Sequence, residues 1–143
     1  SWPKAGTELD TLKTAVGDAA LYLLASATRE FGENTSIFVY AYADRDAPRA
    51  DFTLEVPFAA KTNTVLLWEA DRDSPRVVGD FARAGLLVEA RVFLSELPMA
   101  TSALESATAS IDVSTAYHFP TRFEEFFQTT IFLRDVPRRG AGM

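Results

Sequence analysis

The N-terminal part of the chain places apolar residues three or four positions apart, which is the spacing of an amphipathic helix. Over residues 7–31 these positions are Leu9, Leu12, Val16, Ala20, Leu23, Ala27 and Phe31. Thr7 is suited to the N-cap of such a helix, and Gly32 can end it in the left-handed conformation. The pattern predicts a long N-terminal helix, and the apolar run 19–25 predicts that this helix is covered on two faces.

After Gly32 the apolar positions alternate with a period of two, which is typical of strands. The predicted strands are 36–43, 51–58, 64–70, 86–94, 111–119 and 127–133. Short connections between the first three predict an antiparallel meander, and the last two form a hairpin in outline. Ser74, Pro75 and Gly85 frame a short helix over 75–84, and residues 99–110 are a second helix candidate.

These elements predict an α+β fold, in which the long N-terminal helix packs on a mostly antiparallel sheet of about six strands, with one or two short additional helices. A chain of 143 residues fits a single globular domain spanning 1–143. We expect residues 1–6 and 137–143 to be frayed.

Composition narrows the classes of function. The chain has no cysteine, which excludes disulfides and thiolate chemistry, and no apolar run long enough to span a bilayer, so we expect no membrane insertion. The net charge of −6 opposes binding to nucleic acid. The chain does not begin with methionine and can be a mature form or a trimmed piece, so its compartment stays open.

One short segment recurs where strands are predicted to end. ADRDAPR at 43–49 returns as ADRDSPR at 70–76 and in part as RDVPR at 134–138, while VFLSELPMA at 92–100 keeps only the order of strand, acid, spacer and proline. Proline ends a strand ladder and aspartate bonds nearby backbone N–H groups, so the repeat can be simple turn chemistry. The spacing between copies is irregular, which excludes a repeat array.

The alternative interpretation is functional. Strands one and three of a meander run the same way, so their exits emerge at one end of the sheet as a rim of arginine and aspartate. Such a rim suits a protein interface or an anionic ligand. The candidate interface residues are Arg45, Asp46, Arg49, Arg72, Asp73, Arg76, Arg134, Asp135 and Arg138. The Asp-Arg-Asp triplets lack the glycine and the closing glutamate of a calcium loop, so no metal site is expected.

Signatures of an enzyme are sparse. The chain contains a single histidine, His118, for which an exposed or interface role is expected; a dyad with Asp112 is the catalytic alternative. The serine-nucleophile and glycine-rich phosphate motifs are absent from the sequence, and no cofactor is expected.

The predicted strands carry apolar side chains on both faces. Phe38, Tyr40 and Tyr42 occupy one face of the first strand while Ile37 and Val39 occupy the other, so the second face needs a cover. Segments 75–85 and 99–110, a ligand or another chain could supply it. The leading hypothesis is a non-enzymatic assembly or adaptor domain, acting as a homo-oligomer or docked on a larger protein complex. The alternative is a small-molecule-binding domain or cofactor-free enzyme with an aromatic-lined pocket and His118 as acid or base.

Overall fold

The computed structural model describes residues 9–28, 30–59, 61–99, 101–118 and 122–139. Within these residues the chain forms ten strands and three short 3-10 turns. The strands are β1 (Leu9–Gly17), β2 (Ala20–Ala27), β3 (Thr35–Tyr42), β4 (Phe52–Pro57), β5 (Thr64–Trp68), β6 (Arg76–Ala84), β7 (Leu87–Phe93), β8 (Ser110–Tyr117), β9 (Phe123–Phe132) and β10 (Arg138–Arg139). The turns are η1 (Leu94–Glu96), η2 (Thr101–Glu105) and η3 (Leu133–Asp135).

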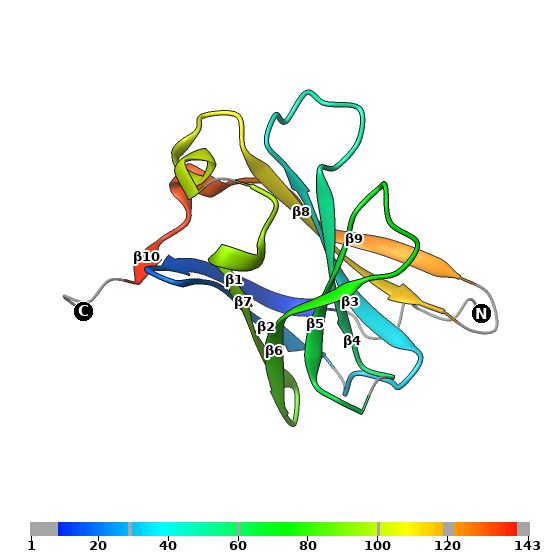
Figure 1. Cartoon of the computed structure of the whole chain (residues 1–143). Coiled ribbons are helices and arrows are strands. Elements are labelled where there is room, and N and C mark those ends of the chain that lie inside the picture. Colours follow the sequence, from blue (N-terminus) through cyan, green and yellow to red (C-terminus); the bar gives the residue numbers. More distant parts are fainter. Residues whose placement is uncertain (1–8, 29, 60, 100, 119–121, 140–143) are drawn as a thin grey trace.

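All strands belong to one sheet, in the order β10-β1-β2-β7-β6-β5-β4-β3-β8-β9. Every neighbouring pair is antiparallel except β1 and β10, which run parallel. The sheet curls round until its two ends approach each other (Figure 1). The chain leaves β9 through η3 and then pairs with β1 as β10, so the barrel-like sheet is nearly closed.

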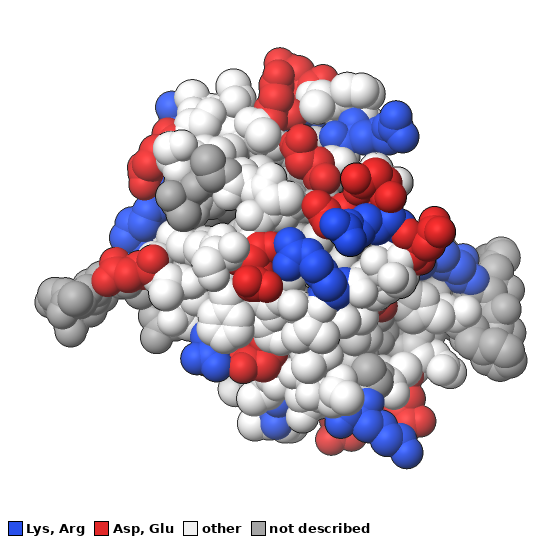
Figure 2. All heavy atoms as spheres, viewed as in Figure 1, with Lys and Arg blue, Asp and Glu red and all other residues white. Residues whose placement is uncertain are grey.

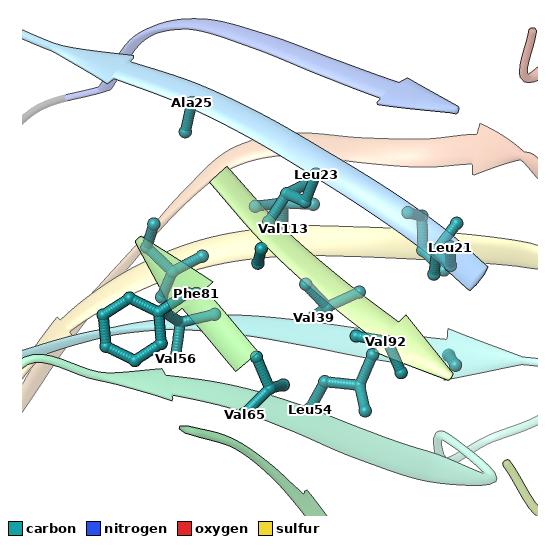
Figure 3. Close-up of a cluster of buried hydrophobic side chains, with 14 of the residues drawn as sticks. Leu21, Leu23, Ala25, Val39, Leu54, Val56, Val65, Phe81, Val92 and Val113 are labelled. Atoms are coloured by element: carbon teal, nitrogen blue, oxygen red, sulfur yellow. The ribbon is translucent and has the colours of Figure 1, made fainter. Parts of the chain in front are cut away.

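The hydrophobic core fills the inside of the curled sheet. Alternate residues of each strand point inward, including Val39, Leu54, Val65 and Val113 (Figure 3). The void that remains among these side chains measures only about 20 Å³, which is too small for a ligand. The larger hollows in the described part of the chain open to solvent, one over β3, β4 and β5 and one between β1 and the end of β9.

The predicted long N-terminal helix is wrong. Residues 9–27 form the hairpin of β1 and β2, in which Leu12 pairs with Ala25 and Val16 with Leu21. β2 buries Leu21, Leu23, Ala25 and Ala27 and leaves the residues between them half-buried, which is a period of two. β1 has a register shift between Leu9 and Thr11. The apolar residues Leu9 and Leu12 therefore stand three positions apart, as they would in a helix. Long-range pairing with β7 here outweighs local helix propensity.

Both short helices are also wrong. Residues 76–84 are β6, and residues 99–110 hold only the 3-10 turn η2 before β8 begins. Gly85 has a positive φ of 60°, as expected for a left-handed position, but it lies in a two-residue hairpin turn between the paired residues Ala84 and Leu87. The fold is therefore nearly all-β and not α+β.

The strands predicted after Gly32 are present. The meander corresponds to β3, β4 and β5, and the C-terminal hairpin to β8 and β9. The predicted frayed ends 1–6 and 140–143 lie outside the described residues, whereas residues 138–139 are held against β1 as β10. Among the described residues, no helix has the length and apolar character that crossing a bilayer requires.

Candidate functional site

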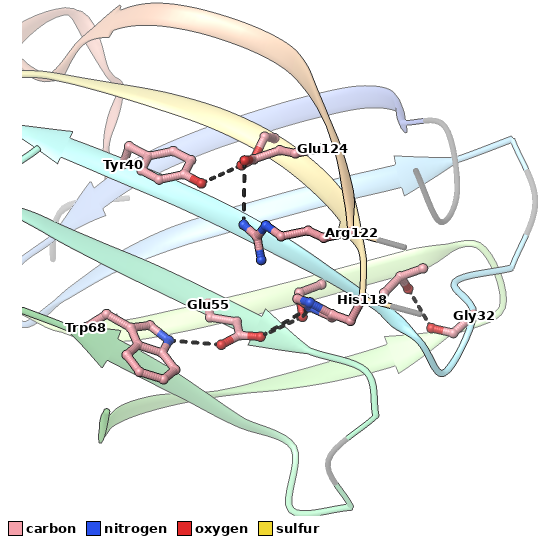
Figure 4. A network of polar contacts seen from close by, with 10 residues as sticks. Gly32, Tyr40, Glu55, Trp68, His118, Arg122 and Glu124 are labelled. Carbon is pink, nitrogen blue, oxygen red and sulfur yellow. Dashed lines mark hydrogen bonds and ion pairs between the residues drawn. The ribbon is translucent and has the colours of Figure 1, made fainter. Parts of the chain in front are cut away.

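A groove of about 540 Å³ lies on the outer face of the sheet, over β3, β4 and β5. His118 and Arg122 lie at one side of it, and the indole ring of Trp68 lies at the other (Figure 4). The lining residues are Phe38, Tyr40, Thr53, Glu55, Trp68, His118 and Arg122. Five of these residues come from β3, β4 and β5, while His118 follows β8 and Arg122 precedes β9.

Strand alternation and register bring these side chains together. In β3 the residues Ile37 and Val39 point into the core, so Phe38 and Tyr40 point outward. Antiparallel pairing sets Glu55 of β4 opposite Phe38, and Thr53 opposite Tyr40. Thr53 also pairs with Trp68 of β5, so the floor of the groove is two rows of cross-strand neighbours.

Glu55 is a largely buried carboxylate of the groove. Its residue is only 9% exposed, and its carboxylate accepts hydrogen bonds from Ser36 Oγ at 2.7 Å and from Trp68 Nε1 at 2.9 Å. His118 Nε2 lies 3.7 Å from Glu55 Oε2 and 2.9 Å from Ser36 Oγ. These contacts hold the carboxylate and the indole ring of Trp68 in one orientation.

A second carboxylate, Glu124 of β9, lies beside Tyr40. Tyr40 and Ser114 donate hydrogen bonds to Glu124 Oε2, and Arg122 Nη2 lies 3.6 Å from Glu124 Oε1. Burial raises the pKa of the Tyr40 phenol well above its usual value, and the hydrogen bond and charge of Glu124 raise it further. Tyr40 is therefore a neutral hydrogen-bond donor at physiological pH.

Aromatic rings form the walls of the groove and explain what covers the second face of β3. Phe126 of β9 packs on Tyr40 with ring centroids 5.7 Å apart, and His118 meets Phe38 edge-on at 5.9 Å. The Arg122 guanidinium lies 5.1 Å above the Phe38 ring, a cation–π arrangement. The cover comes from Phe126 of β9 and from His118 and Arg122, not from residues 75–85 or 99–110.

Ser36, His118 and Glu55 do not form a catalytic relay in this groove. A Ser-His-acid relay needs the acid on one imidazole nitrogen and the hydroxyl on the other, whereas here Ser36 and Glu55 both face Nε2 of His118. Ser36 is also 1% exposed, which keeps its hydroxyl from a substrate. Among the described residues, no three His, Asp or Glu side chains are grouped to hold a metal ion.

The predicted dyad of His118 with Asp112 is not assembled. The two residues are six positions apart along β8 and its end, a distance of about 20 Å in an extended chain. Asp112 Oδ1 instead accepts a hydrogen bond from the backbone N–H of Thr130 at 2.8 Å. Thr130 has a positive φ of 56°, which is strained for a β-branched residue, so Asp112 stabilises an irregular point in β9.

The repeated exit segments emerge at one end of the sheet, because β3, β5, β7 and β9 all run in the same direction. Two copies have the same local structure: FLSELP (93–98) and FLRDVP (132–137) each end a strand with a 3-10 turn. The first residue of each turn, Leu94 or Leu133, is buried in the core. These copies therefore close the end of the barrel with an apolar side chain.

The predicted interface residues of the first two copies make contacts within the molecule. Arg45 donates from Nε to Thr130 Oγ1 at 2.9 Å, and the N–H of Asp46 bonds the Asp44 carboxylate at 3.0 Å, as in an aspartate turn. Arg72 lies 3.6 Å from Glu69, while Arg49 and Asp73 are exposed.

Two of the remaining arginines form ion pairs with acids outside their own exit segment. Arg76 lies 3.3 Å from Glu96 of η1, and Arg138 lies 3.1 Å from Glu105 of η2. The exposed Arg134 lies 3.8 Å from its neighbour Asp135. On the face shown in Figure 2, acidic and basic side chains are interspersed in the same way. The role of these residues in an interface stays a prediction.

Apart from His118, the predicted site residues did not include those of the groove. The alternation of Phe38 and Tyr40 and the single acid within the apolar strand FTLEVP were visible in the sequence. The missing information was register, since only the pairing of β3 with β4 and of β4 with β5 sets Glu55 beside Phe38 and near Trp68. A glutamate on the outward face of an apolar strand was the one available signal.

The fold and the groove define the class of protein. It is a nearly all-β domain whose barrel-like sheet has a filled core and carries an aromatic and acidic groove on its outer face. No protein-family model matches the chain, and no curated protein matches its sequence.

Proposed function

We propose that this protein is a ligand-binding domain that holds a small organic molecule in the outer groove and does not catalyse a reaction on it. The observation that carries this proposal is the buried carboxylate of Glu55, held by Ser36 and Trp68 at the edge of an open groove. Ligand sites combine apolar walls with a few fixed polar groups, and a volume of about 540 Å³ lies within the usual range for small molecules.

Support also comes from the preorganisation of the groove. The Trp68 ring is 37% exposed but fixed through its N–H, and Tyr40 is fixed through Glu124. Rings that are already ordered lose little conformational entropy when a ligand packs on them. The groove thus favours a ligand with a flat or compact apolar part and a polar group that reaches Glu55.

A screen that reads the Trp68 indole N–H by ¹H–¹⁵N NMR tests the proposal. The chain has two tryptophans, so Trp68→Phe identifies the signal. Small cations, anions, sugars and neutral aromatic compounds are added in turn, and we expect a saturable shift from at least one group. Thr53→Phe, which fills the groove floor between Tyr40 and Trp68, should abolish that shift, whereas Thr62→Phe in an exposed loop should preserve it. If no compound class moves the signal, the proposal is wrong.

A second candidate function is self-association, the earlier leading hypothesis in a more specific form. β9 lies at one end of the sheet order and exposes Phe123, Phe126 and Phe127 by 41%, 50% and 39%. An edge strand with exposed aromatic residues favours pairing with another chain. This observation supports β9, more than the arginine-rich exits, as the surface of a homo-oligomer.

Light scattering on a sizing column tests this candidate. We expect a discrete oligomer of the 15.7 kDa chain, which Phe127→Lys on β9 should dissociate. Val77→Lys on the exposed face of β6 adds the same charge and should leave the mass unchanged. A wild-type monomer at high protein concentration would rule out self-association, and an oligomer that responds to Arg72→Ala instead would return the interface to the exits.

A further inference from the structure

Glu55 in the groove and Glu124 beside it differ in their counter-ions. Glu124 has a permanently charged partner, because Arg122 Nη2 lies 3.6 Å from it. Glu55 receives its hydrogen bonds from the neutral groups Ser36 Oγ and Trp68 Nε1. Among the described residues its one ion-pair partner is His118, which carries a charge only when it is protonated.

A carboxylate that is buried without a permanent counter-ion is costly, because neutral hydrogen bonds replace only part of its hydration. Glu55 opens on one side to the groove, so the missing charge can be supplied from there. Each of its oxygens accepts one hydrogen bond from a neutral donor and retains a free lone pair for another.

The walls beside Glu55 suit the same kind of ligand. The Trp68 ring is 37% exposed and its N–H is bonded to Glu55, so one accessible π face lies next to the charge, whereas Phe38 is buried beneath Arg122. Aromatic faces attract ammonium and guanidinium groups, and an aromatic cage with an acid recognises them strongly. The chain already shows this preference within the groove, since the Arg122 guanidinium lies over Phe38 and pairs with Glu124.

We infer that the ligand of the groove is an organic cation, whose ammonium or guanidinium group lies against Glu55 and the face of the Trp68 ring. This inference rests on the proposed function, because it names the chemical class of the ligand for the same groove. An anionic group is disfavoured next to Glu55, because the carboxylate repels it and the guanidinium of Arg122 is already paired with Glu124.

The experiment compares three probes of nearly equal shape on the full chain. Choline is the cation, 3,3-dimethyl-1-butanol is its neutral isostere, and 3,3-dimethylbutanoate is an anion with the same apolar group. The readout is the Trp68 indole signal, titrated to saturation. We expect choline to bind at least about tenfold more tightly than either of the other two.

Glu55→Gln removes the charge and retains the size of the side chain, and we expect it to reduce choline affinity by about tenfold or more. Glu89→Gln, at an exposed position of β7, makes the same change in net charge and should leave the affinity unaltered. The comparison of probes on the wild-type chain needs no variant, so it decides the inference even if Glu55→Gln does not fold.

The outcomes separate this inference from the proposal on which it rests. If the neutral or the anionic probe binds as tightly as choline, the groove is a ligand site but the cationic ligand is wrong. Equal choline affinity of wild type and a folded Glu55→Gln variant also overturns the inference. If none of the three probes, and no compound of the wider screen, moves the Trp68 signal, the proposed function fails and the inference fails with it.

Discussion

Single side chains of this protein acquire their chemistry from neighbours on other strands. Tyr40 is an ordinary outward-facing residue of β3 until Glu124 and Ser114 of the C-terminal hairpin reach it. The same holds for Glu55, whose bonding partners come from β3 and β5. The chemistry of the groove residues therefore depends on the pairing of strands that are distant in the sequence.

The raised pKa of Tyr40 predicts a loss of stability in alkali. Its stabilising contribution is complete below the unfolded value of 10.0 and is lost as the pH rises above it, because the unfolded chain then releases a proton that the folded chain retains. The slope is at most about 1.4 kcal/mol per pH unit, and less because the phenol is partly exposed.

Urea unfolding from about pH 8 to about pH 11 measures this effect. Tyr40→Phe should remove the alkaline decline that Tyr40 contributes, whereas Tyr42→Phe on the same face of β3 should retain it. If wild type and Tyr40→Phe lose stability in parallel, the bond to Glu124 does not perturb Tyr40 as described.

At the scale of elements, close pairing with β7 makes residues 76–84 a strand and not the predicted helix. Gly79 of β6 packs so tightly on β7 that an added Cβ would lie 1.9 Å from the carbonyl oxygen of Arg91. A helix would not require this glycine, and a strand paired at this distance does. Gly79 is thus a residue of the pairing and not a helix interruption.

Gly79→Ala should therefore destabilise the protein by about 2 to 3 kcal/mol, because the backbone of β7 must move to admit a methyl group. Gly32→Ala is the matched control, since its Cβ would lie 3.8 Å from the nearest atom, and it should change stability by less than about 1 kcal/mol. Thermal or urea unfolding of both variants gives the comparison, and equal effects would contradict the close approach of β6 and β7.

At the scale of the whole molecule, the last described residues complete the barrel. β10 pairs with Val16 and Gly17 of β1, and the N–H of Val16 donates to the carbonyl of Pro137 at 2.8 Å. Arg138 stabilises this closure, because its guanidinium donates to the carbonyls of Leu133 and Val136 in and beside η3 and to that of Leu104 in η2.

Arg138→Ala should accordingly cost about 2 kcal/mol of stability, since several carbonyls lose a charged donor. Arg134→Ala removes an exposed arginine that pairs only with the adjacent Asp135, and should cost about 0.5 kcal/mol or less. The pair distinguishes an arginine that closes the barrel from one that only lies on the rim. Equal costs in urea unfolding would mean that β10 does not contribute to closure.

Several features of this protein are determined by local sequence. Alternation in 35–58 and the turn chemistry of Asp-x-Pro depend on neighbouring residues, and β3, β4 and their exit appear where the pattern predicts them. The exits also emerge at one end, because a meander of short connections requires it.

Tertiary structure alone decided the N-terminal hairpin and the groove. Residues 9–27 satisfy a helical spacing, and only pairing of β2 with β7 and of β1 with β10 makes the strand form more stable. The groove depends on the register of β3, β4 and β5 and on the end of β8, which together join Ser36, Glu55 and His118 from separate segments. Local sequence specifies which residues face outward, whereas long-range hydrogen bonding and core packing specify which of them meet.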